Sequence, residues 1–103
     1  MSTTAVAAPR GQRLLAAAEL LRALASPVRL SLIAELGDGP RCVHELVTAC
    51  GESQSLVSQH LRVLRGSRLV RAERRGREVV YTLTDPHVSH IVTDAISHAE
   101  EAE

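Results

Sequence analysis

A chain of 103 residues with a formal net charge of zero can hold one domain at most, and its composition excludes several classes of protein. There is no Phe or Trp and a single Tyr, so Leu, Val, Ile and Ala must build the core, which favours packed helices over a large sheet. Two cysteines do not suggest a disulfide framework and indicate a reduced, cytoplasmic protein, and no apolar run approaches the roughly 20 residues that span a bilayer.

The beginning of the chain predicts a loose arm followed by two helices. Residues 1–11 have no hydrophobic signal core and indicate a flexible arm, so the folded domain is expected over residues 12–103. A helix is predicted from about residue 12 to residue 25, because apolar residues recur there at helical spacing: Leu14, Ala17, Ala18, Leu21 and Leu24. Ser26-Pro27 then supplies an N-cap followed by proline at the first helical position. The second helix is expected to end at residues 37–40 and to bury Val28, Leu32, Ile33 and Leu36.

Two further helices are joined by a tight turn. The first starts near Arg41 and places four apolar residues along one face: Val43, Leu46, Val47 and Cys50. Residues 51–53 (Gly-Glu-Ser) make the turn, and Ser53 is a good N-cap for a helix over residues 54–65. Two short helices joined by a turn of about four residues that contains Gly are typical of a helix-turn-helix.

After this helix the hydrophobic period changes from about 3.6 to about 2, which predicts strands. Residues 69–74 and 77–83 are expected to form a β-hairpin with its bend at Arg75-Gly76. Asp85-Pro86 then begins a last helix that runs to the end of the sequence. The expected fold is mainly α with a small β-hairpin: a winged helix-turn-helix flanked by N- and C-terminal helices.

The helix over residues 54–65 has the two faces that a DNA-recognition helix needs. Val57, Leu61 and Leu64 are expected to point inward. Polar side chains lie on or near the opposite face: Gln54, Ser55, Ser58, Gln59 and Arg62. Gln and Arg can make bidentate hydrogen bonds to base edges, and Ser can contact bases or phosphates. The helix is therefore predicted to read double-stranded DNA.

Arginine is concentrated next to this helix, although the total charge is zero. All twelve basic residues are arginines, and seven of them fall between Arg62 and Arg77, where Glu73 is the only acid. Such a stretch can form a local anion-binding face. Within it, three arginines suit a wing that holds backbone phosphates beside the groove: Arg74, Arg75 and Arg77. Solvated surface would explain each polar feature singly, but their combination with this order of elements favours DNA binding.

Five short stretches follow one another in an order that resembles a known family. They are residues 24–30 (LASPVRL), 42–46 (CVHEL), 56–61 (LVSQHL), 76–81 (GREVVY) and 85–87 (DPH). Over about residues 12–103 the chain resembles the ArsR/SmtB family of bacterial metal-sensing repressors. The resemblance implies a homodimer built on the first and last helices, an imperfect palindromic operator upstream of metal-handling genes, and release of the DNA by metal. One departure is Gln59-His60, where members often carry His-Gln, and it is expected to bear on operator sequence more than on fold.

On the last helix the resemblance implies a metal site. The zinc-type pattern of the family is Asp-x-His followed, after ten residues, by His-x-x-Glu or His-x-x-His. In this sequence Asp85, His87, His98 and Glu101 match the pattern, and every spacing is the same. His87 and His98 are eleven residues apart, roughly 16 Å along a helix, whereas a zinc ion holds its nitrogen ligands at about 2 Å. One chain therefore cannot bring both imidazoles to one ion, although both project from the same side of the helix.

Two antiparallel copies of this helix would bring the ligands together. Asp85 and His87 would meet the partner's His98 and the partner's Glu101, and two-fold symmetry would give two equivalent sites per dimer. An apolar stripe beside the ligands could pack such a pair: Val88, Ile91, Val92, Ala95 and Ile96. Without any metal, Asp85 can act as a helix N-cap and the histidines can be exposed surface.

The donor types indicate which metal would bind. Two histidines and two carboxylates suit Zn(II), with Co(II) as the usual surrogate, and the absence of thiolates argues against arsenic, lead or mercury. His90 is interpreted as a spectator.

Cysteine offers a second, weaker sensing site. Cys42, His44 and Glu45 lie where some relatives place a thiolate-rich site, but such a site needs more Cys or His, and the N-terminal arm has neither. Cys50 is expected in the core. A disulfide between Cys42 and Cys50 would have to span roughly 12 Å of helix, which is too far without unwinding.

The leading hypothesis from the sequence is a zinc-responsive repressor. Its apo homodimer would hold two recognition helices about one DNA turn apart, and Zn(II) between the C-terminal helices would release the operator. One alternative is an ArsR-type regulator that responds to oxidation of Cys42 or to no small molecule. Another is a winged helix that binds an acidic protein through its arginines. An enzyme is not expected, because no nucleophile is paired with a base and a metal held by four protein ligands has no open position for a substrate.

Overall fold

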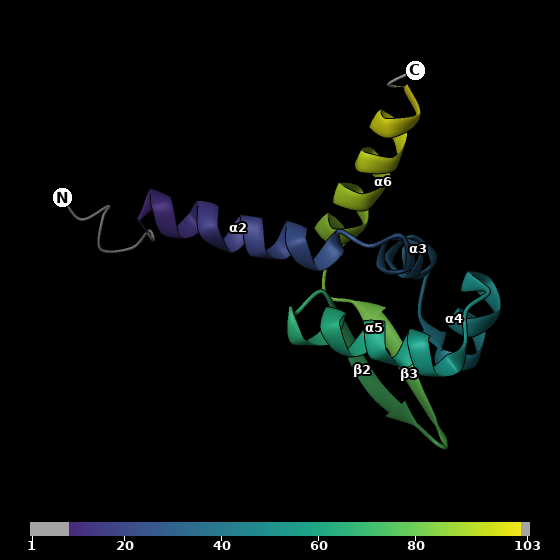
Figure 1. The fold of residues 1–103 in the computed structure, drawn as a ribbon. Helices are drawn as coiled ribbons and strands as arrows, with labels where there is room; N and C mark the ends of the chain where they lie inside the picture. Colours follow the sequence, from purple (N-terminus) through teal and green to yellow (C-terminus); the bar gives the residue numbers. More distant parts are fainter. Residues whose placement is uncertain (1–8, 102–103) are drawn as a thin grey trace.

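A computed structural model describes residues 9–101, whose elements follow the expected order (Figure 1). They are α2 (Arg10–Leu24), α3 (Pro27–Leu36), β1 (Arg41–Cys42), α4 (Val43–Cys50), α5 (Gln54–Gly66), β2 (Val70–Arg75), β3 (Glu78–Leu83) and α6 (Pro86–Glu101). The mainly α fold with a small antiparallel sheet, in the arrangement of a winged helix-turn-helix, confirms the expected class. Most of the expected arm, residues 1–8, lies outside the described residues, and α2 starts at Arg10 where the sequence indicated Gln12.

Serine side chains cap the first turns of two helices, as the sequence predicts. The Ser26 hydroxyl accepts a hydrogen bond from the Arg29 backbone N–H at 3.2 Å, with proline at the first position of α3. The Ser53 hydroxyl accepts from the Leu56 N–H at 3.1 Å and begins α5. Between the two, Gly51 ends α4 with a left-handed φ of 71°, which glycine adopts without a Cβ penalty. These local signals define the helix-turn-helix.

The sequence analysis missed a third strand. Arg41 and Cys42 pair with Tyr81 and Val80 of β3, so α4 begins at Val43 and not near Arg41. The sheet order is β1-β3-β2. Two residues are too few for an alternating pattern to appear in the sequence, and β1 exists because β3 offers it a free edge.

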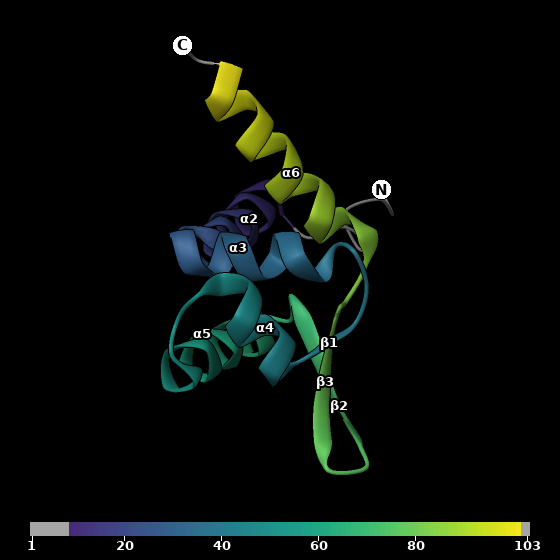
Figure 2. The same ribbon diagram turned by 90° about the vertical axis from the view of Figure 1, so that its right-hand side faces the viewer.

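The hairpin of β2 and β3 is the predicted wing. Its register runs from Val70 opposite Leu83 to Arg75 opposite Glu78, which leaves Gly76-Arg77 as the turn, one residue later than predicted. The left-handed φ of 63° at Gly76 suits a two-residue hairpin turn. The hairpin extends away from the helices, and its tip lies at the far end of the molecule from α6 (Figure 2).

The core joins α3, α4 and α5 to the base of the hairpin and uses aliphatic side chains throughout, as the composition requires. The buried residues of this central body are Leu32, Ile33, Leu36, Leu46, Val57, Leu61, Leu64, Leu69 and Val70. Three of the four residues expected to be buried on α3 are buried, and Val28 is half-buried against them. Helices α2 and α6 contribute at their near ends, through Ala23 and Leu24 and through Val88 and Val92.

Helices α2 and α6 otherwise project from this body as two arms (Figure 1). The apolar stripe expected on α2 is uncovered except near Leu24, because Leu14 and Leu21 are 61% and 54% exposed. Leu15, which is outside that stripe, is also 59% exposed. The radius of gyration is 15.6 Å, against about 13 Å for a compact domain of this size. No helix within residues 9–101 is both long and apolar enough to cross a membrane.

Arm α6 is held closely to α3 at one point. A Cβ at Gly37, directly after α3, would lie 2.8 Å from the Ser89 hydroxyl of α6. Because real Cβ contacts are longer than this, glycine permits the close approach of α6, and the first turn of α6 is thereby seated on the body.

Candidate nucleic-acid interface and metal-binding helix

Helix α5 presents the two faces that the sequence predicts. Val57, Leu61 and Leu64 are fully buried. Of the five polar residues predicted to face DNA, four are exposed and Ser58 is half-buried; the exposed ones are Gln54, Ser55, Gln59 and Arg62. The outer face of α5 therefore offers amide, hydroxyl and guanidinium groups that can hydrogen-bond to base edges or phosphates.

The wing carries arginine at its tip. Arg74, Arg75 and Arg77 are all exposed around the turn of the hairpin. Arg75 donates to Glu73 at 3.1 Å, but both side chains are more than half exposed, so water screens this pair and leaves it weak. The tip is thus a basic, accessible projection of the kind that contacts DNA backbone.

The run of seven arginines is spread over α5, the connection that follows it and the hairpin. Arg62 belongs to the outer face of α5, and Arg74, Arg75 and Arg77 to the wing tip. The remaining three line a hollow at the base of β2, together with Val70, Ala72 and Thr84: Arg65, Arg68 and Arg71. Between α5 and β2 the chain turns at Arg68, which has a left-handed φ of 61°.

Helix α6 separates the predicted metal ligands into two pairs. At its start, the Asp85 carboxylate accepts a hydrogen bond from the His87 backbone N–H at 2.8 Å, which confirms Asp85 as an N-cap. The His87 Nδ1 lies 3.3 Å from the same carboxylate oxygen, and the two side chains are 88% and 51% exposed. His98 and Glu101 are exposed at the other end of the helix. Within residues 9–101 of one chain, no three His, Cys, Asp or Glu residues converge on a metal position.

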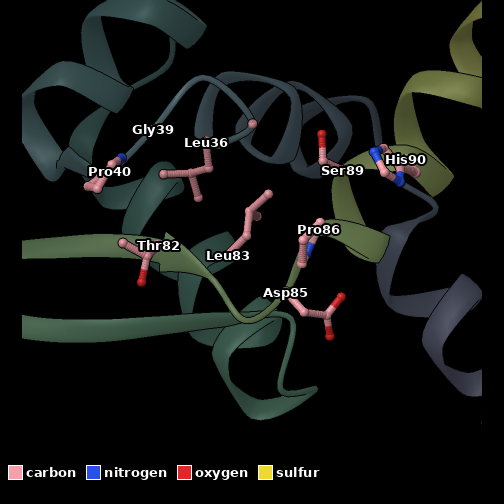
Figure 3. Close-up of a pocket in the computed structure, with 10 residues that line it drawn as sticks. Leu36, Gly39, Pro40, Thr82, Leu83, Asp85, Pro86, Ser89 and His90 are labelled. Carbon is pink, nitrogen blue, oxygen red and sulfur yellow. The ribbon is translucent and has the colours of Figure 1, made fainter.

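His90 lies beside an open hollow between α3, β3 and α6 (Figure 3). The hollow has a volume of about 400 Å³ and is lined mainly by apolar and backbone groups, with Asp85 and His90 at its α6 side. Figure 3 shows the side chains of Asp85 and His90 on either side of Pro86, not directed toward each other. Within residues 9–101, Asp85, His87 and His90 do not gather as a three-residue metal site.

Residues 42–50, which include both cysteines, make contacts that stabilise the fold. The Glu45 carboxylate accepts a hydrogen bond from the Cys42 backbone N–H at 2.9 Å, and this bond holds the pKa of Glu45 below its usual value. Cys42 is buried, whereas His44 is exposed. Cys50, expected in the core, is half-buried at its edge, with its sulfur 3.4 Å from the Ser31 hydroxyl. The two cysteines begin and end an intact α4, so nothing brings them together.

Known proteins share this sequence and this fold. The model of the arsR family of bacterial regulatory proteins matches residues 26–72. The HTH-type transcriptional repressor SmtB of Mycobacterium tuberculosis is 54% identical over 95 residues, which is 92% of this chain and 70% of that protein.

Two solved structures superpose closely on this chain. One is the homodimeric winged helix-turn-helix DNA-binding domain of a possible ArsR-family regulator from Mycobacterium bovis. It has a TM-score of 0.79 at 29% identity and covers 95% of this chain and 92% of that one. The other is apo-NmtR, with a TM-score of 0.75 at 42% identity, covering 94% of this chain and 82% of that one. NmtR is an HTH-type transcriptional regulator of M. tuberculosis.

The second helix of the helix-turn-helix, α5, has a polar outer face and lies next to a basic wing. These features define a winged helix-turn-helix transcriptional regulator. The chain belongs to the ArsR family of bacterial regulatory proteins, as its sequence motifs implied. Its relatives are transcriptional regulators and not enzymes, in agreement with the sequence analysis.

Proposed function

We propose that this protein is a cytoplasmic, zinc-responsive repressor that binds operator DNA as a homodimer and releases it when Zn(II) binds between the two α6 helices. Residues 12–103 act as one DNA-binding and dimerisation domain, and residues 1–11 act as a flexible arm. The single observation that carries the proposal is the arrangement of α6: two pairs of exposed nitrogen and oxygen donors at opposite ends of one helix, Asp85 with His87 and His98 with Glu101.

The uncovered apolar surface of the arms supports a dimer. An open groove is lined almost entirely by apolar side chains of α2, α3, α6 and the connection between α2 and α3: Leu21, Leu24, Ala25, Leu30, Ile91, Val92 and Ala95. Ile96 extends this surface along α6 and is 38% exposed. Packing against the same surface of a second copy would remove the apolar groove and Ile96 from water. The homodimeric relative from M. bovis, which superposes over 95% of this chain, supports the same assembly.

The DNA contacts proposed for each subunit lie on α5 and the wing. The outer face of α5 would enter the major groove through Gln54, Ser55, Ser58, Gln59 and Arg62. Arg74, Arg75 and Arg77 of the wing would hold backbone phosphates beside it. The repressor SmtB, which is 54% identical over 95 residues of this chain, supports this function.

The donor chemistry of α6 fits Zn(II), with Co(II) as a substitute. One oxygen of Asp85 caps the helix, which leaves the other oxygen for a metal. His87 lies beside this carboxylate, with its Nδ1 3.3 Å from the oxygen that caps the helix, so one imidazole nitrogen and one carboxylate oxygen are available from this end of α6. Together with the partner's His98 and the partner's Glu101, they would make a four-ligand nitrogen and oxygen site, and the metal would supply a cross-link between the subunits.

The test begins by finding a DNA ligand. Duplexes are selected from a random-sequence library by the metal-free protein, and the affinity for the selected duplex is measured by fluorescence anisotropy as Zn(II) is titrated. We expect two Zn(II) per dimer and a loss of affinity of about 5- to 150-fold, the usual range of coupling between two sites. An unchanged affinity at saturating Zn(II) would overturn the proposed switch.

Matched variants identify the ligands. His98→Ala should abolish the effect of Zn(II) on DNA affinity, whereas His90→Ala, on the same exposed helix, should leave it intact. Loss of the effect in His90→Ala alone would contradict the ligand set. If regulation of DNA affinity survives His98→Ala and disappears in Cys42→Ser, the thiol-responsive alternative is favoured instead.

A further inference from the structure

The side chain of Arg29 joins three helices. It starts on α3, and its Nε donates to the Ala23 carbonyl oxygen in the last turn of α2 at 2.6 Å. Its Nη1 lies 3.2 Å from the His60 Nδ1 on α5. Among the side-chain hydrogen bonds within residues 9–101, these are the ones that tie α3 to α2 and α3 to α5. Arg29 and His60 are both half-buried, so the contacts are shielded from water.

The bond to Ala23 fixes the end of α2. The last carbonyls of a helix have no partner within the helix, and a cation near them is favoured by the helix dipole. Ala23 is itself buried, so its carbonyl would have little access to water in place of Arg29. The guanidinium therefore anchors the near end of the arm to α3.

The contact with His60 fixes the recognition helix to the same group. A guanidinium only donates hydrogen bonds, so the His60 Nδ1 must accept and the ring proton must be on Nε2. The neighbouring Gln59 is exposed, whereas His60 contacts α3. The second residue of the Gln59-His60 pair thus takes part in seating α5, a role that the sequence analysis did not foresee.

We infer that Arg29 and His60 are positioning residues that hold α5 at a defined angle to α2 and so determine the spacing of the two recognition helices in the dimer. This inference rests on the proposed homodimer that binds DNA. Helix α2 has 15 residues and is about 22 Å long, so a tilt of about 10° at Arg29 would displace its far end by about 4 Å. That displacement is close to the roughly 3.4 Å rise of one base pair.

The test measures tolerance to half-site spacing. The duplex selected by the wild-type protein is compared with versions that have one base pair inserted or removed between the half-sites, and with a duplex that contains one half-site only. His60→Leu removes the acceptor with little change in volume, and His60→Gln retains an acceptor in its amide oxygen. We expect His60→Leu to lose about tenfold in discrimination between native and altered spacing, from the loss of one charge-assisted hydrogen bond. Its affinity for the single half-site should stay within about twofold of wild type.

His60→Gln should restore the discrimination, which a purely structural role or a lost base contact would not predict. Arg29→Met should act like His60→Leu if it folds; if it does not fold, His60→Leu decides alone, because it leaves the Arg29–Ala23 bond in place. Wild-type discrimination in His60→Leu, or an equal loss on the single half-site, would overturn the inference. If the wild-type protein enriches no sequence from the library, the proposed function fails, and that outcome is distinct from failure of this inference.

Discussion

The central body and the two arms of this protein differ in how their apolar residues are satisfied. In the body, Leu32, Leu46 and Leu61 are fully buried, and α3, α4, α5 and the hairpin close around one core. In the arms, Leu14 and Leu21 of α2 and Ile96 of α6 stay in contact with water. Both regions carry apolar residues at helical spacing, but only the body covers them within one chain.

The difference shows where a second copy is needed. The body supplies its own core, so one subunit suffices for its fold. It also presents the groups proposed to contact DNA. The arms carry uncovered apolar surface and two separated pairs of metal-type donors. Dimer formation would cover the apolar surface and bring the donor pairs of the two subunits together. One surface can therefore serve both assembly and regulation. Four predictions test this division, from the largest expected effect to the smallest.

A cavity in the body should destabilise each subunit most. Leu61→Ala removes a fully buried side chain of α5 and should lower the free energy of unfolding by about 2–5 kcal/mol, measured by urea denaturation. Val63→Ala on the same helix is the control, because Val63 is 40% exposed and should cost much less. Equal costs at the two positions would mean that the core of the body is not where the structure places it.

A charge on the α2 arm should weaken dimerisation and spare the body. Leu21→Glu would lose roughly 1.5–3 kcal/mol of apolar burial between subunits, which raises the dimer dissociation constant about 10- to 100-fold in sedimentation equilibrium. Gln12→Glu, which lies on the other side of α2, should change it little. If Leu21→Glu instead unfolds the protein as Leu61→Ala does, the arm belongs to the body and the comparison fails.

Removal of a helix cap should produce a smaller effect confined to the body. Ser53→Ala deletes the hydroxyl that accepts from the Leu56 N–H and should cost about 1 kcal/mol of stability, measured by thermal or urea unfolding. Ser55→Ala lies two residues further into α5 and is exposed, so it should be close to neutral. A neutral Ser53→Ala would show that packing alone begins the recognition helix.

The smallest predicted effect is an acid sensitivity of the body at Glu45. The Cys42 backbone N–H lowers the pKa of the folded-state carboxylate, so its stabilisation is present above the ordinary value of 4.5 and is lost as the pH falls through the lowered one. Wild type should therefore lose more stability than Glu45→Gln when the pH falls from neutral to below about 4, as measured by urea denaturation at each pH. Identical pH dependence in the two proteins would show that this cap does not contribute.

Much of the body could be predicted because its signals are local. Ser26 and Ser53 each lie three residues from the N–H that they cap, and Gly51 and Gly76 provide left-handed conformations at the turns. The period of two beyond residue 69 indicated the hairpin within one residue. The residues proposed to contact DNA were predicted as one exposed set on α5, and only Ser58 is partly covered.

Features that depend on distant residues could not be predicted in this way. β1 is two residues long and is paired with residues almost forty positions later. The sequence did not show that Arg65, Arg68 and Arg71 line one hollow at the base of β2. The Gln59-His60 pair looked like a change in the DNA-contacting surface, yet His60 contacts Arg29 from a helix 31 residues earlier.

The sequence by itself determined the class of this protein, the limits of most of its helices and the spacing of its candidate ligands on α6. Helical periodicity, caps and turns act over three or four residues, so they can be recognised without a fold. The tertiary structure decided which apolar stripes are covered, which arginines line a common hollow and which group holds the recognition helix. Those outcomes depend on how helices far apart in the chain pack, and packing responds to shape in three dimensions and not to the order of residues.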